Sequence, residues 1–186
     1  MGADLIASGE RIPDFALRAS DNSVWTREHL LRGRRALLVV FRRDCPASRL
    51  LLPLVERMHR RLLRAGLRVA GLSQDSHADT LELADGYSLT FPLLLDFPSF
   101  EFSARLGVRR VPSQITLDAA GTVLTTLVGF SRREQGQLFL RLARELEQPE
   151  VDLLSPVDIV PERHEGSPSA SSRPEGGSGD GGEGSA

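Results

Sequence analysis

Two long apolar runs stand out in the first half of the chain. Ala36–Phe41 reads ALLVVF and Leu67–Ser73 reads LRVAGLS, and a polar segment precedes the first. Such runs are typical of strands that are buried on both faces in the centre of a sheet. Between them, Pro46–Arg64 repeats apolar residues at helical spacing, and Gly66 is placed to end that helix. The first half therefore predicts a strand–helix–strand unit.

The second half continues the alternation of strands and helices. It predicts a polar helix over Ser76–Tyr87, a short apolar strand over 91–96 and a short helix over Phe100–Leu106. A hairpin over 113–130 and an amphipathic helix over Arg132–Glu147 follow. Near the N-terminus, PDFALRASDNSVW predicts a small additional hairpin that turns at Asp21 and Asn22. The order predicts the α/β class, with a mixed central sheet, helices on both faces and an N-terminal hairpin extension.

Composition changes near residue 149. Residues 1–148 carry 21 Arg against 17 acidic residues, whereas residues 149–186 carry 2 Arg against 8 acidic residues. We expect residues 1–148 to form one domain, which is long enough to bury a core. Residues 149–165 are apolar enough to form an extended arm that docks in part on the domain. Residues 166–186 are rich in Gly and Ser, so we expect a disordered acidic tail.

Several classes of function are not indicated by the composition. The chain has no Lys, which excludes Schiff-base chemistry and the lysine of a phosphate-binding loop. Its weak charge and 5% aromatic content do not indicate nucleic-acid binding. No apolar stretch approaches the about 18 residues of a membrane span, and the N-terminus lacks a signal pattern, so we expect a cytoplasmic protein. The four His residues are scattered, and no metal site or other cofactor is expected.

The single cysteine, Cys45, is the main candidate for chemistry. It stands where the first buried strand gives way to a helix, and a helix N-terminus favours the thiolate. Ser48 lies one turn further on and is placed to donate a hydrogen bond to the sulfur, whereas Asp44 would oppose ionisation. Three nearby arginines would add positive charge, namely Arg42, Arg43 and Arg49. We expect a lowered thiol pKa. The other interpretation is a buried small apolar residue, since free cysteines are often buried.

Three segments resemble one superfamily. FRRDCPASRLLLP is similar to the active-site segment W-C-P-x-C-R-x-x-x-P of TlpA/ResA-type thiol-disulfide oxidoreductases, and four residues keep their places: Cys45, Pro46, Arg49 and Pro53. GVRRVPSQITLDAAGTVLTTLVG is similar to G-V-x-x-x-P-[TS]-x-x-x-[IL]-D-x-x-G of the same family. The opening IPDFALRASDNSVWTREHLLRGRRALLVVF resembles the N-terminal hairpin and first helix that TlpA-type proteins share with AhpC/TSA peroxiredoxins. The resemblance implies a thioredoxin-like fold over nearly the whole domain.

The resemblance also implies a substrate groove. Pro112 stands where the family has a cis-proline that faces the active cysteine. In that geometry the backbone of Val111 would lie close to Cys45 and would pair with an extended substrate segment. Ser113 would line the same groove, although a serine that simply starts the following strand is an equal alternative. The Arg-rich segment Glu56–Arg68 is a solvated helix face, or else a binding surface for an acidic partner or for the acidic tail of the chain itself.

The departures from the family pattern fall on the chemistry. Ser48 replaces the second cysteine, so no internal thiol can resolve a mixed disulfide. Peroxiredoxins carry P-x-x-x-T-x-x-C, and this chain has Leu38 and Arg42 at the Pro and Thr positions. The resemblance therefore implies a single-cysteine oxidoreductase or antioxidant protein, in which Cys45 attacks a disulfide or peroxide and an external glutathione-like thiol or thioredoxin reduces it. The alternative is a redox-inactive binding module with the same fold.

Overall fold

The computed structural model describes residues 4–149 and 160–172, which are built around a five-stranded mixed sheet. The sheet order is β5–β4–β3–β7–β8, with strands at Leu93–Leu95, Arg68–Ser73, Ala36–Phe41, Ser113–Leu117 and Val123–Val128. Strands β3, β4 and β5 are parallel, whereas β7 runs antiparallel to β3 and β8 antiparallel to β7. This arrangement confirms the predicted mixed α/β sheet, and β3 has the predicted bounds.

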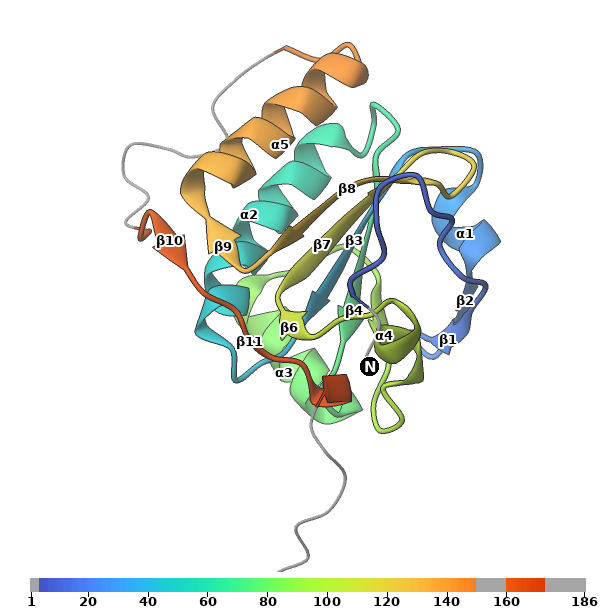
Figure 1. Ribbon diagram of the computed structural model, residues 1–186, viewed down its shortest axis with the longest axis vertical. Helices are drawn as coiled ribbons and strands as arrows, with labels where there is room; N and C mark the ends of the chain where they lie inside the picture. The colour runs from blue at the N-terminus through green and yellow to red at the C-terminus, as the bar shows by residue number, and fades with distance from the viewer. Residues whose placement is uncertain (1–3, 150–159, 173–186) are drawn as a thin grey trace, which may run out of the picture.

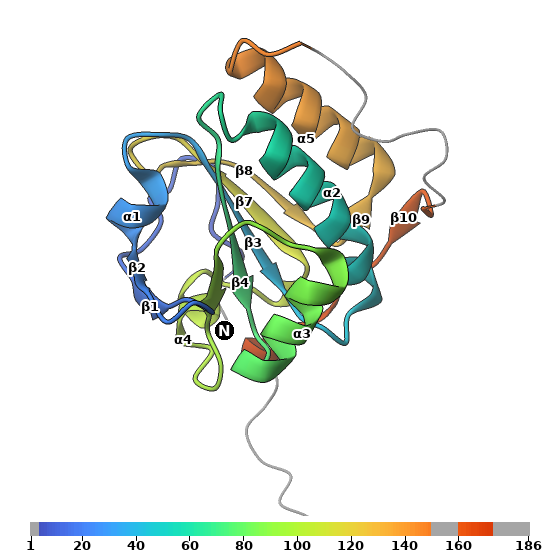
Figure 2. The ribbon, with the colours of Figure 1, turned by 180° about the vertical axis from the view of Figure 1, so that it is seen from behind.

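Helices lie on both sides of the sheet. The helices α1 to α5 span Arg27–Leu31, Pro46–Leu62, His77–Tyr87, Glu101–Arg105 and Arg132–Glu145. Helices α2 and α5 run beside each other on one side, and α1 and α4 lie on the other side (Figures 1 and 2). The predicted N-terminal hairpin is present as β1 (Ala16–Arg18) and β2 (Val24–Thr26), with Asn22 in the left-handed region at φ 67°.

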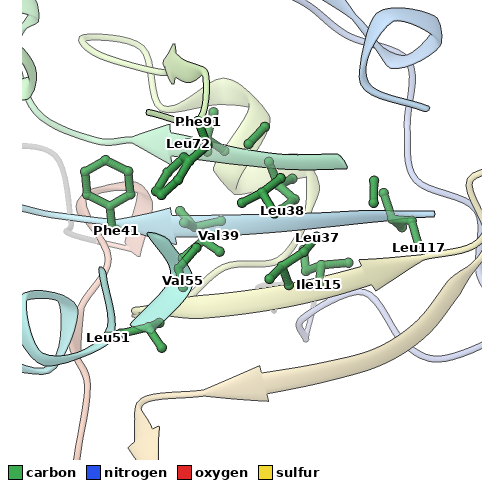
Figure 3. Close-up of a cluster of buried hydrophobic side chains, with 14 of the residues drawn as sticks. Leu37, Leu38, Val39, Phe41, Leu51, Val55, Leu72, Phe91, Ile115 and Leu117 are labelled. Carbon is green, nitrogen blue, oxygen red and sulfur yellow. The ribbon is translucent and has the colours of Figure 1, made fainter. Parts of the chain in front are cut away.

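The core lies where β3 and β4 meet the helices. All six residues of β3 are buried, as expected for a central strand covered on both faces. Leu51 and Val55 of α2 reach this layer (Figure 3). Gly71 of β4 leaves room for the ring of Phe41, because a Cβ at that position would lie 2.8 Å from Phe41 Cε1. The sheet and α2 are therefore held together by close apolar contacts.

The C-terminal region differs from the prediction. Residues 160–172, which we name the C-terminal strap, contain β10 (Arg163–His164), β11 (Ser167–Pro168) and the 3₁₀-helix η1 (Ala170–Ser172). Strand β10 pairs with β9 (Phe130–Ser131), and β11 pairs with β6 (Arg110–Val111). The expected docking of residues 160–165 is thus observed, whereas the expected disorder of residues 166–172 is wrong. Backbone pairing orders this part without large apolar side chains. Residues 150–159 of the arm and 173–186 of the tail lie outside the described residues.

Candidate active site

Cys45 is the N-cap residue of α2, directly after the turn that leaves β3. Its backbone is extended, at φ −88° and ψ 114°, and Pro46 takes the first helical position. Proline is favoured there because the backbone N–H it lacks would have no partner within the helix. The Cys45 side chain is fully buried. The cysteine therefore lies at the predicted strand-to-helix junction, at the positive end of the helix dipole.

The thiol faces the segment that precedes β7. Cys45 Sγ donates a hydrogen bond to the carbonyl oxygen of Val111 at 3.2 Å. The Val111–Pro112 peptide bond is cis, as the resemblance implies. The structure thus brings Cys45, Val111 and Pro112 together, although Cys45 and Val111 are far apart in the sequence.

Two serines set the protonation of the thiol. Burial raises the pKa of the Cys45 thiol, but hydrogen bonds from the hydroxyl and backbone N–H groups of Ser167 and Ser48 outweigh burial and lower the pKa below its ordinary value. The role expected of Ser48 agrees with this arrangement. Ser167 was not among the predicted site residues, because it belongs to a segment that the sequence predicted to be disordered. The Ser48 hydroxyl also accepts a hydrogen bond from the Arg42 backbone N–H at 3.4 Å.

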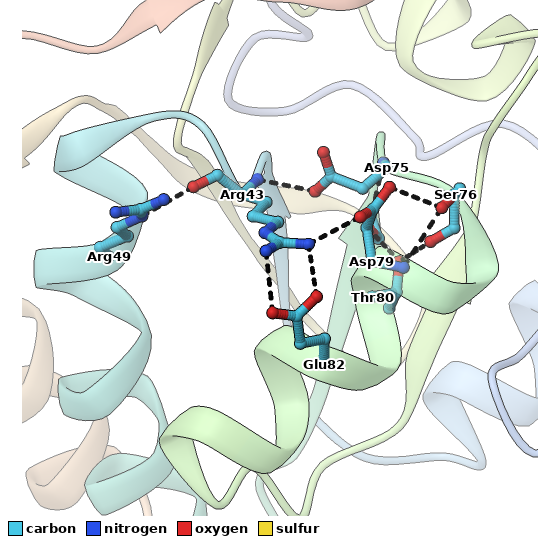
Figure 4. Close-up of polar contacts among 8 residues, drawn as sticks. Arg43, Arg49, Asp75, Ser76, Asp79, Thr80 and Glu82 are labelled. Atoms are coloured by element: carbon cyan, nitrogen blue, oxygen red, sulfur yellow. Dashed lines mark hydrogen bonds and ion pairs between the residues drawn. The ribbon is translucent and has the colours of Figure 1, made fainter.

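The three arginines near Cys45 have other partners than the sulfur, so the expectation that their charge lowers the thiol pKa needs correction. The Arg42 guanidinium is paired with Asp44 and donates to the carbonyl oxygen of Pro168 in the strap at 3.0 Å. Arg43 is held in a network with Asp79 and Glu82, at 2.6 and 2.7 Å (Figure 4). These contacts position the strap and the turn between β3 and α2.

Arg49 and Ser113 stabilise the backbone around the site. Arg49 is exposed, and its Nε donates to the carbonyl oxygen of Arg43 at 2.8 Å, which links α2 to the turn before it (Figure 4). The buried Ser113 hydroxyl donates to the carbonyl oxygen of Arg110 at 2.6 Å. Ser113 therefore joins β6 to the start of β7, which agrees with the interpretation of a strand-start serine.

A pocket of about 590 Å³ lies beside the strap. Its walls include Arg42, Gln74, Asp75 and Ala170, together with the segment 97–100. Burial raises the pKa of the Asp75 carboxyl, although this group accepts a hydrogen bond from the Arg43 backbone N–H at 2.7 Å. Within residues 4–149 and 160–172, no three His, Cys, Asp or Glu side chains form a group that could hold a metal ion. No helix in this part of the chain is both long and apolar enough to cross a membrane.

Removing the Ser48 hydroxyl should make the thiol harder to ionise. In a Ser48→Ala variant the thiolate loses a hydrogen-bond donor, so the Cys45 pKa should rise and the ionisation midpoint should move to higher pH. The ultraviolet absorbance of the thiolate, followed as a function of pH, measures this midpoint without a reagent that must reach the buried sulfur. Ser113→Ala is the matched control, because its hydroxyl bonds to Arg110 instead. Equal midpoints in the wild type and Ser48→Ala would contradict the role of Ser48.

Comparison with known proteins agrees with this geometry. Residues 8–126 match the AhpC/TSA family. Among solved structures, one assigned as the thiol:disulfide interchange protein DsbE from Chlorobium tepidum has a TM-score of 0.70 at 22% identity, and the match covers 76% of this chain and 99% of that one. Peroxidoxin BcpB from Mycobacterium tuberculosis has a TM-score of 0.66 at 18% identity, with 77% and 98% covered.

A third structure aligns over more of the chain. It is a hypothetical protein from Sinorhizobium meliloti, with a TM-score of 0.72 at 15% identity, and the match covers 92% of this chain and 97% of that one. No protein with a curated description matches the sequence. These likenesses establish that the fold is thioredoxin-like.

Proposed function

Because the chain belongs to the AhpC/TSA family, we propose that it is a thiol oxidoreductase in which Cys45 is the single nucleophile. The observation that carries the proposal is the setting of the sulfur. Cys45 lies at the N-terminus of α2, next to cis-Pro112, and donors on Ser48 and Ser167 lower its pKa. A lowered thiol pKa increases the fraction of thiolate, which is the form that attacks sulfur or oxygen.

The proposed reaction with a disulfide is an exchange in two steps. The Cys45 thiolate attacks one sulfur, a mixed disulfide forms, the substrate S–S bond breaks, and the departing thiolate takes up a proton. An external thiol, after losing its proton, then attacks the substrate sulfur of the mixed disulfide. This attack expels the Cys45 thiolate and releases a new disulfide. The low pKa of Cys45 favours this second step, because a thiol of lower pKa leaves faster.

The proposed reaction with a peroxide consumes two external thiols. The Cys45 thiolate takes one oxygen, which leaves a sulfenic acid and an alcohol or water. The first thiol forms a mixed disulfide with Cys45 and releases water, and the second thiol releases Cys45 with a new disulfide. We expect disulfides to react faster than peroxides. The position of the peroxiredoxin threonine holds Arg42, whose guanidinium is engaged by Asp44 and by Pro168.

The external reductant is a glutathione-like thiol or thioredoxin in this proposal. Both are thiols of a reducing compartment such as the cytoplasm, where a single free cysteine stays reduced. A second candidate function is a redox-inactive binding module. The observation that favours it is the burial of Cys45, whose side chain has no exposed surface while the strap is in place.

Mass spectrometry of the intact protein tests the proposal. Incubation with glutathione disulfide should add one glutathione to the wild-type chain, and thioredoxin should then remove it. An equal concentration of hydrogen peroxide should give a slower oxidation at the same residue. The reaction should be repeated on a variant with a displaced strap, so that access and reactivity are separated. If that open variant also gains no adduct, the binding-module function is favoured instead.

A further inference from the structure

The C-terminal strap and the active-site cysteine meet at the same short strand, β6. Strand β11 pairs with β6 in antiparallel register, with Ser167 opposite Val111 and Pro168 opposite Arg110 (Figure 1). The pairing continues beyond β11, where the Ser169 N–H donates to the Arg109 carbonyl oxygen at 2.8 Å. The carbonyl oxygen of Val111 is also the acceptor of the Cys45 thiol. The strap therefore occupies the edge beside cis-Pro112 and contacts the sulfur through Ser167.

Two glycines let the strap come this close. A Cβ on Gly166 would lie 2.3 Å from the Val111 carbonyl oxygen, which no real side chain tolerates. Gly129 has φ +77°, and a Cβ there would lie 3.1 Å from the carbonyl oxygen of His164 in the strap. In addition, the Arg110 guanidinium donates to the Gly166 carbonyl oxygen at 3.0 Å. The strap thus fits only because its backbone can lie directly against the backbone of β6 and of Gly129.

Polar side chains of the domain hold the far end of the strap. Ser169 is buried, and its hydroxyl accepts a hydrogen bond from the Gln74 side-chain amide at 2.7 Å. The Ala170 N–H donates to the side-chain oxygen Oε1 of Gln74 at 3.0 Å, and the Arg42 guanidinium donates to the backbone carbonyl oxygen of Pro168 at 3.0 Å. These are hydrogen bonds that water replaces when the segment leaves, so each adds little net stability. The strap is specifically placed: polar contacts hold its far end, and Val160 at its start packs against the hydrophobic core.

Serine and cysteine differ only in the exchange of oxygen for sulfur. Ser167 lies opposite Val111, and its hydroxyl donates a hydrogen bond to the Cys45 sulfur. We propose that the strap is a built-in pseudosubstrate, which fills the groove meant for an extended polypeptide and places Ser167 where the reacting cysteine of a protein disulfide would lie. The inference rests on the proposed function for its chemistry. The proposal also specifies the substrate class, namely an extended polypeptide segment in which glycine or another very small residue directly precedes the reacting cysteine. Such a substrate reaches Cys45 only after the strap has moved out.

A cysteine at position 167 tests this placement. In a Ser167→Cys variant of the full chain, glutathione disulfide first forms a mixed disulfide with Cys45 and releases one glutathione thiolate. The thiolate of the introduced cysteine then attacks the Cys45 sulfur, an internal disulfide forms, and the second glutathione leaves and takes up a proton. Non-reducing peptide mapping should find this internal disulfide in nearly all molecules. Ser172→Cys, at the exposed end of the strap, is the control and should not bridge. Equal bridging by both variants, or by neither, would overturn the placement.

A second variant tests the closure without adding a thiol. Gly166→Val should displace the strap, and the rate of Cys45 alkylation by iodoacetamide should rise about tenfold or more, since local opening limits access to buried groups. The rate should be measured at alkaline pH, where the Cys45 thiol is ionised in the wild type and in the variant alike. Gly136→Val is the control, because a Cβ at Gly136 meets nothing within 4 Å.

The two proposals fail in different ways. If alkylation of Gly166→Val is no faster than that of the wild type, the strap does not close the groove. If alkylation is faster but glutathione disulfide adds nothing to the open protein, the strap proposal stands and the oxidoreductase function fails.

Discussion

A Cys45→Ser variant should lose every thiol-linked activity of this protein. Cys45 is the only cysteine in the sequence, so no second thiol can form the mixed disulfide or the sulfenic acid. A serine hydroxyl is a far weaker nucleophile at neutral pH, and loss of a covalent nucleophile lowers turnover by about 10⁴-fold or more. The measurement is the reduction of a model disulfide by thioredoxin, with the uncatalysed rate subtracted.

The fold of this variant should remain intact. Serine has nearly the shape of cysteine, and its hydroxyl can donate to the Val111 carbonyl oxygen as the thiol does. We therefore expect an unchanged circular dichroism spectrum and a melting temperature within a few degrees of the wild type. Ser113→Ala is an activity control near the site, because the Ser113 hydroxyl bonds to Arg110. Activity that survives in Cys45→Ser would show that the chemistry does not pass through this sulfur.

A Phe41→Ala variant should lose about 3–5 kcal/mol of unfolding free energy. Phe41 is fully buried at the end of β3, and its ring fills the space that the missing Cβ of Gly71 leaves open. Alanine would leave a cavity at this point, where the chain turns toward Cys45. Urea denaturation, monitored by circular dichroism, gives the unfolding free energy and its dependence on urea concentration.

Phe97→Ala provides the comparison for this result, because Phe97 is 49% exposed. Its loss should cost no more than about 1 kcal/mol, as is usual for substitutions at the surface. Equal losses for the two variants would mean that the contact between Phe41 and Gly71 does not carry the stability assigned to it.

The elements that could be predicted are those in which burial leaves a periodic signal. The run at Ala36–Phe41 predicted β3 with its observed ends, because every residue of that strand is buried. Ser76 was expected to begin a helix, and it is the N-cap of α3, with its hydroxyl accepting from the Asp79 N–H at 3.2 Å. The position of Cys45 followed in the same way, since the end of a buried strand and the start of a helix locate the junction between them.

The strap could not be predicted, because its order comes from pairing with distant residues. Ser167 and Pro168 form a two-residue strand with no apolar periodicity, and Ser169 is buried by contact with Gln74, almost a hundred positions earlier. A segment of Gly, Ser and Pro has the composition of disorder when it is considered alone. The sequence indicated that the arginines next to Cys45 would lower the thiol pKa, because only residues close in sequence could be considered. In the structure, Ser167 has part of that role, although it is distant in the sequence.

The covalent attachment of the strap has a consequence for any molecule that competes with it. A segment tethered to its own groove acts at an effective concentration on the order of millimolar, however dilute the protein is. A free peptide that made only the strap's contacts with Val111, Gln74 and Arg42 would have to reach that concentration to displace half of the straps. A substrate present at micromolar levels must therefore gain binding free energy from surface beyond the groove. On the proposed function, the tether therefore favours whole folded partners over short peptides.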